Sequence, residues 1–116
     1  MESIKLVSGQ VVFCYYPFTS QTKSKHRPAF VVVNLNNDDF IACKISSQPV
    51  GASEKHTILI DDSDFESGGL GRQSKVVPTS IFTITKKVIT SSVGVLKEEK
   101  RNEIIERIKD ILDGKV

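Results

Sequence analysis

The chain carries the sequence HRPAFVVV at residues 26–33, and this stretch decides its fold. The apolar run after Pro28 is rich in β-branched and aromatic residues, which favour strands over helices. Proline holds the residue before it in extended backbone, so Arg27 is expected to meet the strand with a fixed side-chain direction. We therefore predict a strand over residues 29–35, with a guanidinium and an imidazole at its entrance.

Other segments share this composition and are also predicted as strands, with polar or glycine-containing turns between them. They span residues 11–16, 40–46, 57–60 and 75–84. Residues 34–39 are expected to form a tight polar connection, and residues 48–55 and 63–73 to form longer surface loops. Short strands at this spacing predict a small barrel or sandwich.

The hydrophobic period changes near the C-terminus. Apolar side chains recur at helical spacing between about residues 97 and 113, at Ile104, Ile105, Ile108, Ile111 and Leu112. Gly114 follows as a stop signal, and charged residues occupy the opposite face. The sequence therefore predicts a mainly β protein with one C-terminal amphipathic helix packed on the sheet.

Length and composition limit the classes of protein that fit this chain. Its 116 residues suffice for one compact domain, so a single domain over residues 1–116 is expected. A net charge of +2 is too small for a general nucleic-acid coat, so any basic function must be local.

Cysteine usage and hydropathy indicate the compartment. Cys14 and Cys43 lie inside apolar runs without metal-ligand spacing, which predicts buried thiols in a reducing cytoplasm. The N-terminus has no apolar signal core, and no segment has the length that spans a bilayer. We expect a cytoplasmic protein with no membrane partner, no metal and no cofactor.

A basic loop leads into the strand that begins after Pro28. It contains Lys23, Lys25, His26 and Arg27. A guanidinium holds a phosphate through two parallel hydrogen bonds, and a histidine can transfer a proton near neutral pH. In the same loop, Phe18 offers a ring on which a base can stack. The loop predicts the edge of a nucleic-acid site; the alternatives are a solvated turn for the cations and a core position for Phe18.

Two hydroxyl side chains, Ser46 and Ser47, stand at the end of the strand predicted over residues 40–46. They could donate hydrogen bonds to phosphate oxygens or orient a ribose hydroxyl. The alternative is that they merely begin a turn, where serine is common. Arg72 and Lys75 could supplement a phosphate groove.

Taken in order, these signals make the chain resemble the PemK/MazF family of toxins over nearly its whole length. The resemblance rests on GQVVF at residues 9–13, PFT at 17–19, HRPA at 26–29, ISSQ at 45–48, Gly69-Leu70, a strand from Ser74, and GVL at 94–96 before the helix. It implies an SH3-like small β-barrel, usually a homodimer. It also implies a metal-independent endoribonuclease that cuts single-stranded RNA and is neutralised by a cognate antitoxin.

Carried over residue by residue, the resemblance implies that Arg27 engages the scissile phosphate. Ser46 matches the accompanying hydroxyl residue, usually a threonine, and Ser47 matches the second hydroxyl. His26 stands where some members also carry histidine. These matches make Arg27, Ser46 and His26 the catalytic candidates. The candidates for RNA contact are Phe18, Lys23, Lys25, Ser47, Gln48, Arg72, Lys75 and Thr79.

One departure from the family lies on the strand predicted over residues 75–84. Many members have an acidic residue there, whereas this strand has no carboxylate, and Val77 and Thr79 stand at the equivalent positions. The leading interpretation is a toxin-type endoribonuclease. The alternatives are a catalytically silent barrel that binds RNA or a protein partner, and a toxin that poisons DNA gyrase.

Overall fold

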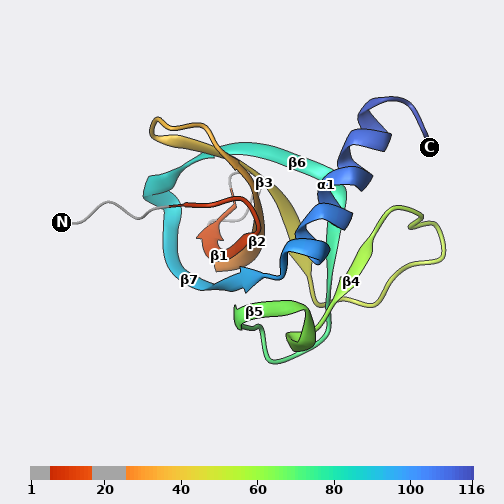
Figure 1. Ribbon diagram of the computed structural model, residues 1–116, viewed down its shortest axis with the longest axis horizontal. Helices are drawn as coiled ribbons and strands as arrows, with labels where there is room; N and C mark the ends of the chain where they lie inside the picture. The colour runs from red at the N-terminus through yellow and green to blue at the C-terminus, as the bar shows by residue number, and fades with distance from the viewer. Residues whose placement is uncertain (1–5, 17–25) are drawn as a thin grey trace.

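The computed structural model describes residues 6–16 and 26–116, in which seven strands form one antiparallel sheet and a single α-helix follows (Figure 1). The elements are β1 (Gln10–Tyr15), β2 (His26–Asn34), β3 (Asp39–Ser46), β4 (Ile58–Ile60), the 3₁₀ helix η1 (Asp62–Asp64), β5 (Phe65–Gly68), β6 (Ser74–Thr85), the 3₁₀ helix η2 (Lys86–Val88), β7 (Ile89–Leu96) and α1 (Glu98–Leu112). The predicted mainly β fold with a C-terminal helix is confirmed.

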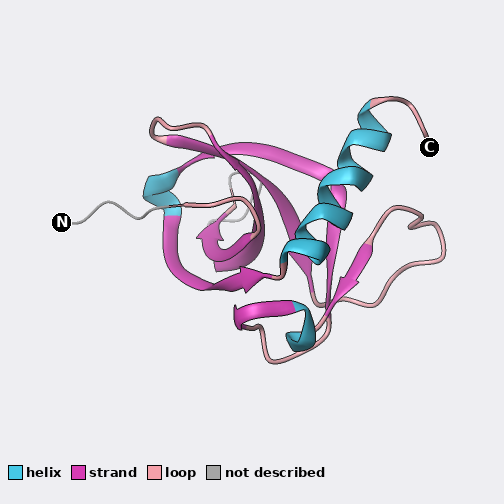
Figure 2. Ribbon diagram, viewed as in Figure 1, coloured by secondary structure: helices cyan, strands magenta, loops and turns pink. Residues whose placement is uncertain are grey.

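The sheet curls strongly, but its two end strands do not pair with each other. Its strand order is β4-β6-β3-β2-β1-β7-β5, which puts β4 and β5 at opposite ends. Only residues 61–64 join these two strands, and a link of that length reaches less than about 20 Å. The two ends of the sheet must therefore approach each other, and Figure 2 shows the strands curling into a half-barrel.

Two hydrophobic clusters use the two faces of the curled sheet. Successive strand residues point to opposite faces, so Val11 joins one cluster and Val12 the other. The first cluster lies between the sheet and α1, where Ile104 and Ile108 are buried. The second is built from β1, β2, β3 and β6 and lies within the curl, around Phe40. Both cysteines are buried, as predicted.

The predicted tight connection between β2 and β3 is confirmed as a short polar turn. Asn36 adopts a left-handed backbone conformation with φ of 62°, which asparagine tolerates better than most residues. The Asn34 side chain accepts a hydrogen bond from the Asn36 N–H at 2.9 Å. Asparagine side chains thus replace part of the backbone pairing at this turn.

The prediction of an irregular loop over residues 63–73 is wrong in part, because η1 and β5 lie within it. Pairing of β5 with β7 requires glycine at two crossing points. A Cβ atom on Gly68 would lie 2.1 Å from the Val93 carbonyl oxygen, and one on Gly94 would lie 2.2 Å from that of Ser67. This contact joins segments far apart in the chain, so the composition of either segment alone does not reveal it.

The helix prediction is correct to within a residue at each end, but its apolar stripe is shorter than expected. The sequence predicts Leu112 on the packed face of the helix. Its side chain is instead 74% exposed, because the last turn extends beyond the sheet. Strand β2 also begins earlier than predicted, at His26, so the basic pair belongs to the strand itself. Within residues 6–16 and 26–116, no helix is long and apolar enough to cross a membrane.

Candidate functional site

A groove of about 420 Å³ opens at the edge where β1 and β3 end and where β2 and β6 begin. Six of the residues singled out from the sequence line it: His26, Arg27, Ser46, Ser47, Gln48 and Arg72. The other lining residues are Phe13, Pro28, Lys44, Ile45, Leu70 and Ser74. The structure therefore brings all three catalytic candidates to one surface.

Antiparallel pairing explains why the two decisive motifs meet. Ala29 on β2 lies opposite Lys44 on β3. Extending this register by two residues sets Arg27 level with Ser46. The HRP and ISSQ motifs, far apart in the sequence, thus lie side by side because β2 and β3 form a hairpin.

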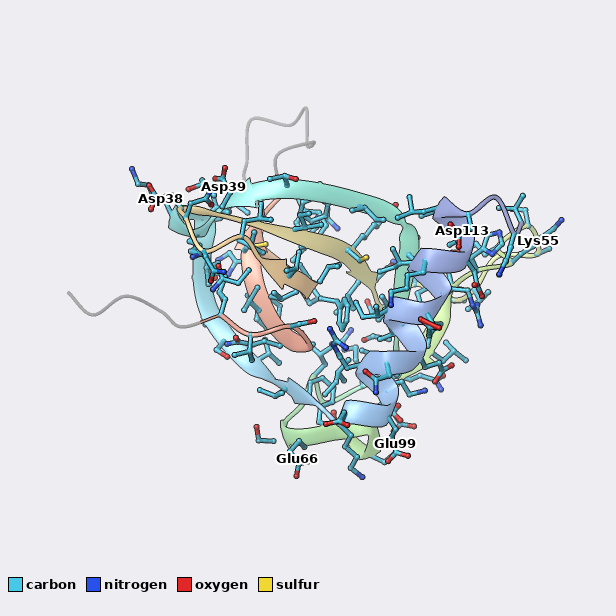
Figure 3. All side chains as sticks on the ribbon, turned by 45° about the horizontal axis from the view of Figure 1, so that its top comes forward. Asp38, Asp39, Lys55, Glu66, Glu99 and Asp113 are labelled. Atoms are coloured by element: carbon cyan, nitrogen blue, oxygen red, sulfur yellow. The ribbon has the colours of Figure 1, made fainter. Side chains whose placement is uncertain are left out.

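The groove is a cationic surface. Three permanent cations line it, Arg27, Lys44 and Arg72, and no carboxylate is among its described lining residues. Asp38 in the β2–β3 turn and Asp39 at the start of β3 lie at the far end of those strands, and Glu66 and Glu99 are at the periphery (Figure 3). Glu54 and Asp62 lie beside the groove but are not among its described lining residues. A small net charge therefore conceals a strong local concentration of positive charge, which suits a phosphate-bearing ligand.

Sequence reasoning missed Lys44. The signal was present, because a single lysine interrupts the apolar run from Phe40 to Ile45. In a half-buried strand such a residue marks an outward-facing position. Lys44 is exposed and lies between Ala29 on β2 and Val77 on β6.

The Arg27 guanidinium is exposed and forms no hydrogen bond or ion pair with the described residues. Beneath it, the Tyr16 hydroxyl donates to the Pro28 carbonyl and accepts from the Ile45 N–H at 3.2 Å, which ties β2 to β3. Burial raises the pKa of Tyr16, while the Ile45 N–H and the positive charge of Arg27 act against that rise. Tyr16 therefore stays protonated and supports the strand ends below the groove.

His26 lies against two aromatic rings at one side of the groove. Its ring centroid is 5.0 Å from that of Tyr15 and 6.5 Å from that of Phe13, both in edge-on geometry. Its Nδ1 atom lies 3.3 Å from the Thr90 hydroxyl oxygen on β7. The imidazole is thus positioned by three different side chains even though it is exposed to solvent.

The Ser46 hydroxyl oxygen accepts a hydrogen bond from the Gln48 N–H at 3.1 Å. This bond begins a turn, which is the alternative role that the sequence analysis gave for Ser46. It uses a lone pair of the oxygen and leaves the hydroxyl proton to be donated. Ser46 can therefore shape the turn and still donate to an anion in the groove.

The exposed Asp62 carboxylate holds the loop that carries Arg72. The Asp62 Oδ1 atom accepts hydrogen bonds from the N–H groups of Leu70 at 3.0 Å and Gly71 at 3.1 Å. Gly71 has φ of 77°, a conformation that glycine adopts without strain. Asp62 is eight and nine residues from its two partners, so these contacts depend on how η1 and β5 fold.

The structure does not bring Lys75 and Thr79 into the groove. Lys75 is 7% exposed, and its Nζ atom donates to the Pro49 carbonyl at 3.0 Å and pairs with Glu54 at 2.8 Å. Thr79 is exposed in a bulge of β6, where the pairing with β3 shifts register. Phe18, Lys23 and Lys25, also predicted to contact RNA, lie outside the described residues.

Metal-ligating groups are not clustered in the described part of the chain. Among those residues, no three or more His, Cys, Asp or Glu side chains are arranged to hold a metal ion. The described lining of the groove offers guanidinium, ammonium, imidazole and hydroxyl groups.

The family model for the PemK-like, MazF-like toxin of type II toxin-antitoxin systems matches residues 8–112. The chain belongs to this family, and the resemblance noted from its motifs is confirmed. No curated protein sequence matches the chain.

Solved structures of similar fold include several toxins. An endoribonuclease in complex with its cognate antitoxin, from Mycobacterial species, has a TM-score of 0.70 at 18% identity, covering 94% of this chain and 96% of that one. MazF from Deinococcus radiodurans has a TM-score of 0.69 at 14% identity, covering 96% and 99%. The Mycobacterium tuberculosis toxin MazF-mt6 has a TM-score of 0.68 at 15% identity, covering 90% and 96%. At these identities the likeness establishes the fold.

Proposed function

We propose that this toxin-family protein is an endoribonuclease that cuts single-stranded RNA and that a cognate antitoxin neutralises it. The observation that carries the proposal is the groove itself, in which Arg27, Lys44, Arg72 and the Ser46 hydroxyl converge and whose described lining contains no carboxylate. Two of the similar structures are described as endoribonucleases, one of them bound to its antitoxin, which supports the same activity here.

The lining of the groove fits a nucleic-acid strand. Each phosphodiester carries one negative charge, and the three cations can hold the backbone through charge-assisted hydrogen bonds. Phe13 and Leu70 add apolar surface beside those cations, on which an unpaired base can rest. Single-stranded RNA exposes both features at once.

In the proposed reaction, the ribose 2′-oxygen attacks the adjacent phosphorus and the bond from phosphorus to the 5′-oxygen breaks. The products are a 2′,3′-cyclic phosphate and a 5′-hydroxyl. His26 accepts the proton of the 2′-hydroxyl, and the leaving 5′-oxygen takes a proton from solvent. Arg27 and the Ser46 hydroxyl donate to the non-bridging oxygens, where negative charge grows in the transition state.

The test is cleavage of a long single-stranded RNA by the purified protein in EDTA, with mapping of cut sites and end groups. We expect discrete cuts that leave cyclic phosphates. Arg27→Ala should lower the rate by about 100-fold to 1000-fold, because it removes a donor to the transition-state oxygens. Its stability should change by less than about 0.5 kcal/mol, since Arg27 is exposed and unpaired among the described residues.

Lys87→Ala is the matched control, because it removes an exposed cation from η2, at the opposite end of β6 from the groove. It should cut at the wild-type rate. If a folded Arg27→Ala protein also cut at that rate, Arg27 would have no role in cleavage.

A second candidate function follows from the missing acid on β6, which has no carboxylate from Ser74 to Thr85. A barrel that lacks the acidic residue found on this strand in many family members could bind RNA without cutting it. If the wild-type protein, free of antitoxin, leaves varied RNAs intact but binds them with an Arg27-dependent affinity, the silent-barrel interpretation replaces the endoribonuclease.

A further inference from the structure

Thr90 occupies a β-bulge between β7 and β1. Phe13 on β1 lies opposite Ser91, and Cys14 lies opposite Ile89, so the residue between them on β7 has no opposite residue on β1. A bulge of this kind turns a side chain away from its regular position. The Thr90 hydroxyl oxygen consequently lies 3.2 Å from the Phe13 carbonyl oxygen and 3.3 Å from the Nδ1 atom of His26.

The protons in this small network can be counted. A threonine hydroxyl has one proton, and the Phe13 carbonyl can only accept, so the Thr90 proton is given to Phe13. Towards His26, the Thr90 oxygen can therefore only accept.

A hydrogen bond from His26 to Thr90 then requires a proton on Nδ1. A neutral imidazole carries one proton on its two nitrogens, so Nε2 holds the lone pair. Nε2 makes no hydrogen bond with the described residues, whereas the Tyr15 and Phe13 rings contact the imidazole. The ring thus has its basic nitrogen available on a residue that lines the groove.

We propose that Thr90 is a positioning residue that holds His26 in the Nδ1–H tautomer and so makes Nε2 the proton acceptor for the 2′-hydroxyl. The catalytic half of this role depends on the proposed endoribonuclease function. The tautomer is inferred from the two contacts of the Thr90 hydroxyl oxygen and can be measured without RNA.

The first experiment measures the tautomer by two-bond ¹H–¹⁵N NMR correlations of the histidine side chains in the full chain. The spectra are recorded near pH 8.5, and a His26→Gln variant distinguishes His26 from His56. We expect a protonated Nδ1 and an unprotonated Nε2 in the wild type and in Thr90→Ser, which keeps the hydroxyl. Thr90→Val should shift the ring to the Nε2–H form that predominates in water. A wild-type Nε2–H pattern, or an unchanged pattern in Thr90→Val, would overturn the assignment.

The second experiment compares single-turnover cleavage rates and RNA affinities of the same variants. Thr90→Val should cut about 10-fold or more slowly with unchanged affinity, because the wrong tautomer presents a proton where an acceptor is needed. Thr90→Ser should restore the rate to within about twofold, and His26→Gln should lower it about 100-fold. In the His26→Gln background, Thr90→Val should cost nothing more, since Thr90 acts through the imidazole.

The outcomes separate the inference from the function on which it rests. Additive losses in the double variant would show that Thr90 does not act through His26, and the positioning role would be rejected while the endoribonuclease stood. If the wild type showed the Nδ1–H tautomer but cut no RNA, the proposed function and the catalytic half of the role would both fall.

Discussion

Arg27 and Lys75 are both cations close to strand ends, and the tertiary structure gives them opposite surroundings. Arg27 is exposed over the groove and has no partner among the described residues. Lys75 is buried, and its ammonium is already bound by Glu54 and the Pro49 carbonyl. Lys44, which the sequence analysis did not single out, lines the groove, whereas Lys75, which was expected there, does not. A side chain's charge thus identifies a candidate, and its neighbours decide whether the charge is available.

The two buried cysteines predict a loss of stability at alkaline pH. Burial raises the pKa of Cys14 to about 11 and that of Cys43 to about 12, from 9.0. Above pH 9 the unfolded chain releases thiol protons that the folded chain retains, so the free energy of unfolding falls as pH rises towards 11. The slope is at most about 1.4 kcal/mol per pH unit for each thiol. Urea unfolding between pH 7 and pH 10 measures it.

Burial raises the pKa of Tyr16 as well, so the phenol adds to this loss only above about pH 10. Cys14→Ala/Cys43→Ala is the control, since it removes both thiols and should flatten the slope between pH 9 and pH 10. A free energy of unfolding that stayed constant over that range in the wild type would show that the thiols are not shielded from water.

At the scale of elements, carboxylates hold the two loops that flank the groove. The loop from β3 to β4 carries Ser47 and Gln48, and Glu54 within it binds Lys75 of β6 and accepts from the Gly51 N–H. The loop from β5 to β6 is held by Asp62. The groove edges are therefore fixed by ion pairs and hydrogen bonds that lie outside the groove itself.

Lys75→Met should loosen the β3–β4 loop without entering the groove. The methionine keeps the apolar stem of the buried side chain but removes the ammonium that donates to Glu54 and to the Pro49 carbonyl. We expect faster hydrogen exchange at the Gly51 amide and a KM for RNA raised about fivefold, which corresponds to about 1 kcal/mol of lost positioning. The value of kcat should stay within about twofold. Lys55→Met, an exposed lysine of the same loop, is the control (Figure 3).

The same contact predicts an acid limit for loop order. The side-chain hydrogen bond from Lys75, followed by the Gly51 N–H, lowers the pKa of Glu54 below 4.5. The pair is therefore fully formed above pH 4.5 and is lost as pH falls through the lowered value. Protection of the Gly51 amide that was the same in Lys75→Met and the wild type would contradict the role of this pair.

At the scale of the whole molecule, the fold separates the charges that the sequence intermixes. One end of the half-barrel collects the groove cations, while Asp38 and Asp39 lie at the other end of β2 and β3. We expect this separation to favour the approach of a polyanion at the groove edge, even though the net charge is only +2.

Assembly is the prediction that belongs to this scale. We expect a two-fold homodimer with RNA running along the groove at or near the interface, because β4 and β5 are edge strands of the sheet and the resemblance noted from the motifs implies a homodimer. Light scattering should then give twice the 12.8 kDa mass of one chain. A monomer mass at micromolar concentration would count against this assembly.

The sequence alone determined the features that arise from neighbouring residues. The β-branched run after Pro28, the polar turn at residues 34–39 and the isoleucine spacing of α1 depend on local backbone preference and hydrophobic period. The family motifs also brought Arg27, His26 and Ser46 to attention before any contact was known.

Only the tertiary structure decided which of those residues share a surface and what supports them. The pairing of β5 with β7, the burial of Lys75, and the approach of Thr90 to His26 depend on strand register and on bulges between segments distant in the chain. A shift of one residue in any of these pairings would turn the side chains to the other face of the sheet. No local property of the sequence reports that register, because it is set by the packing of both hydrophobic clusters at once.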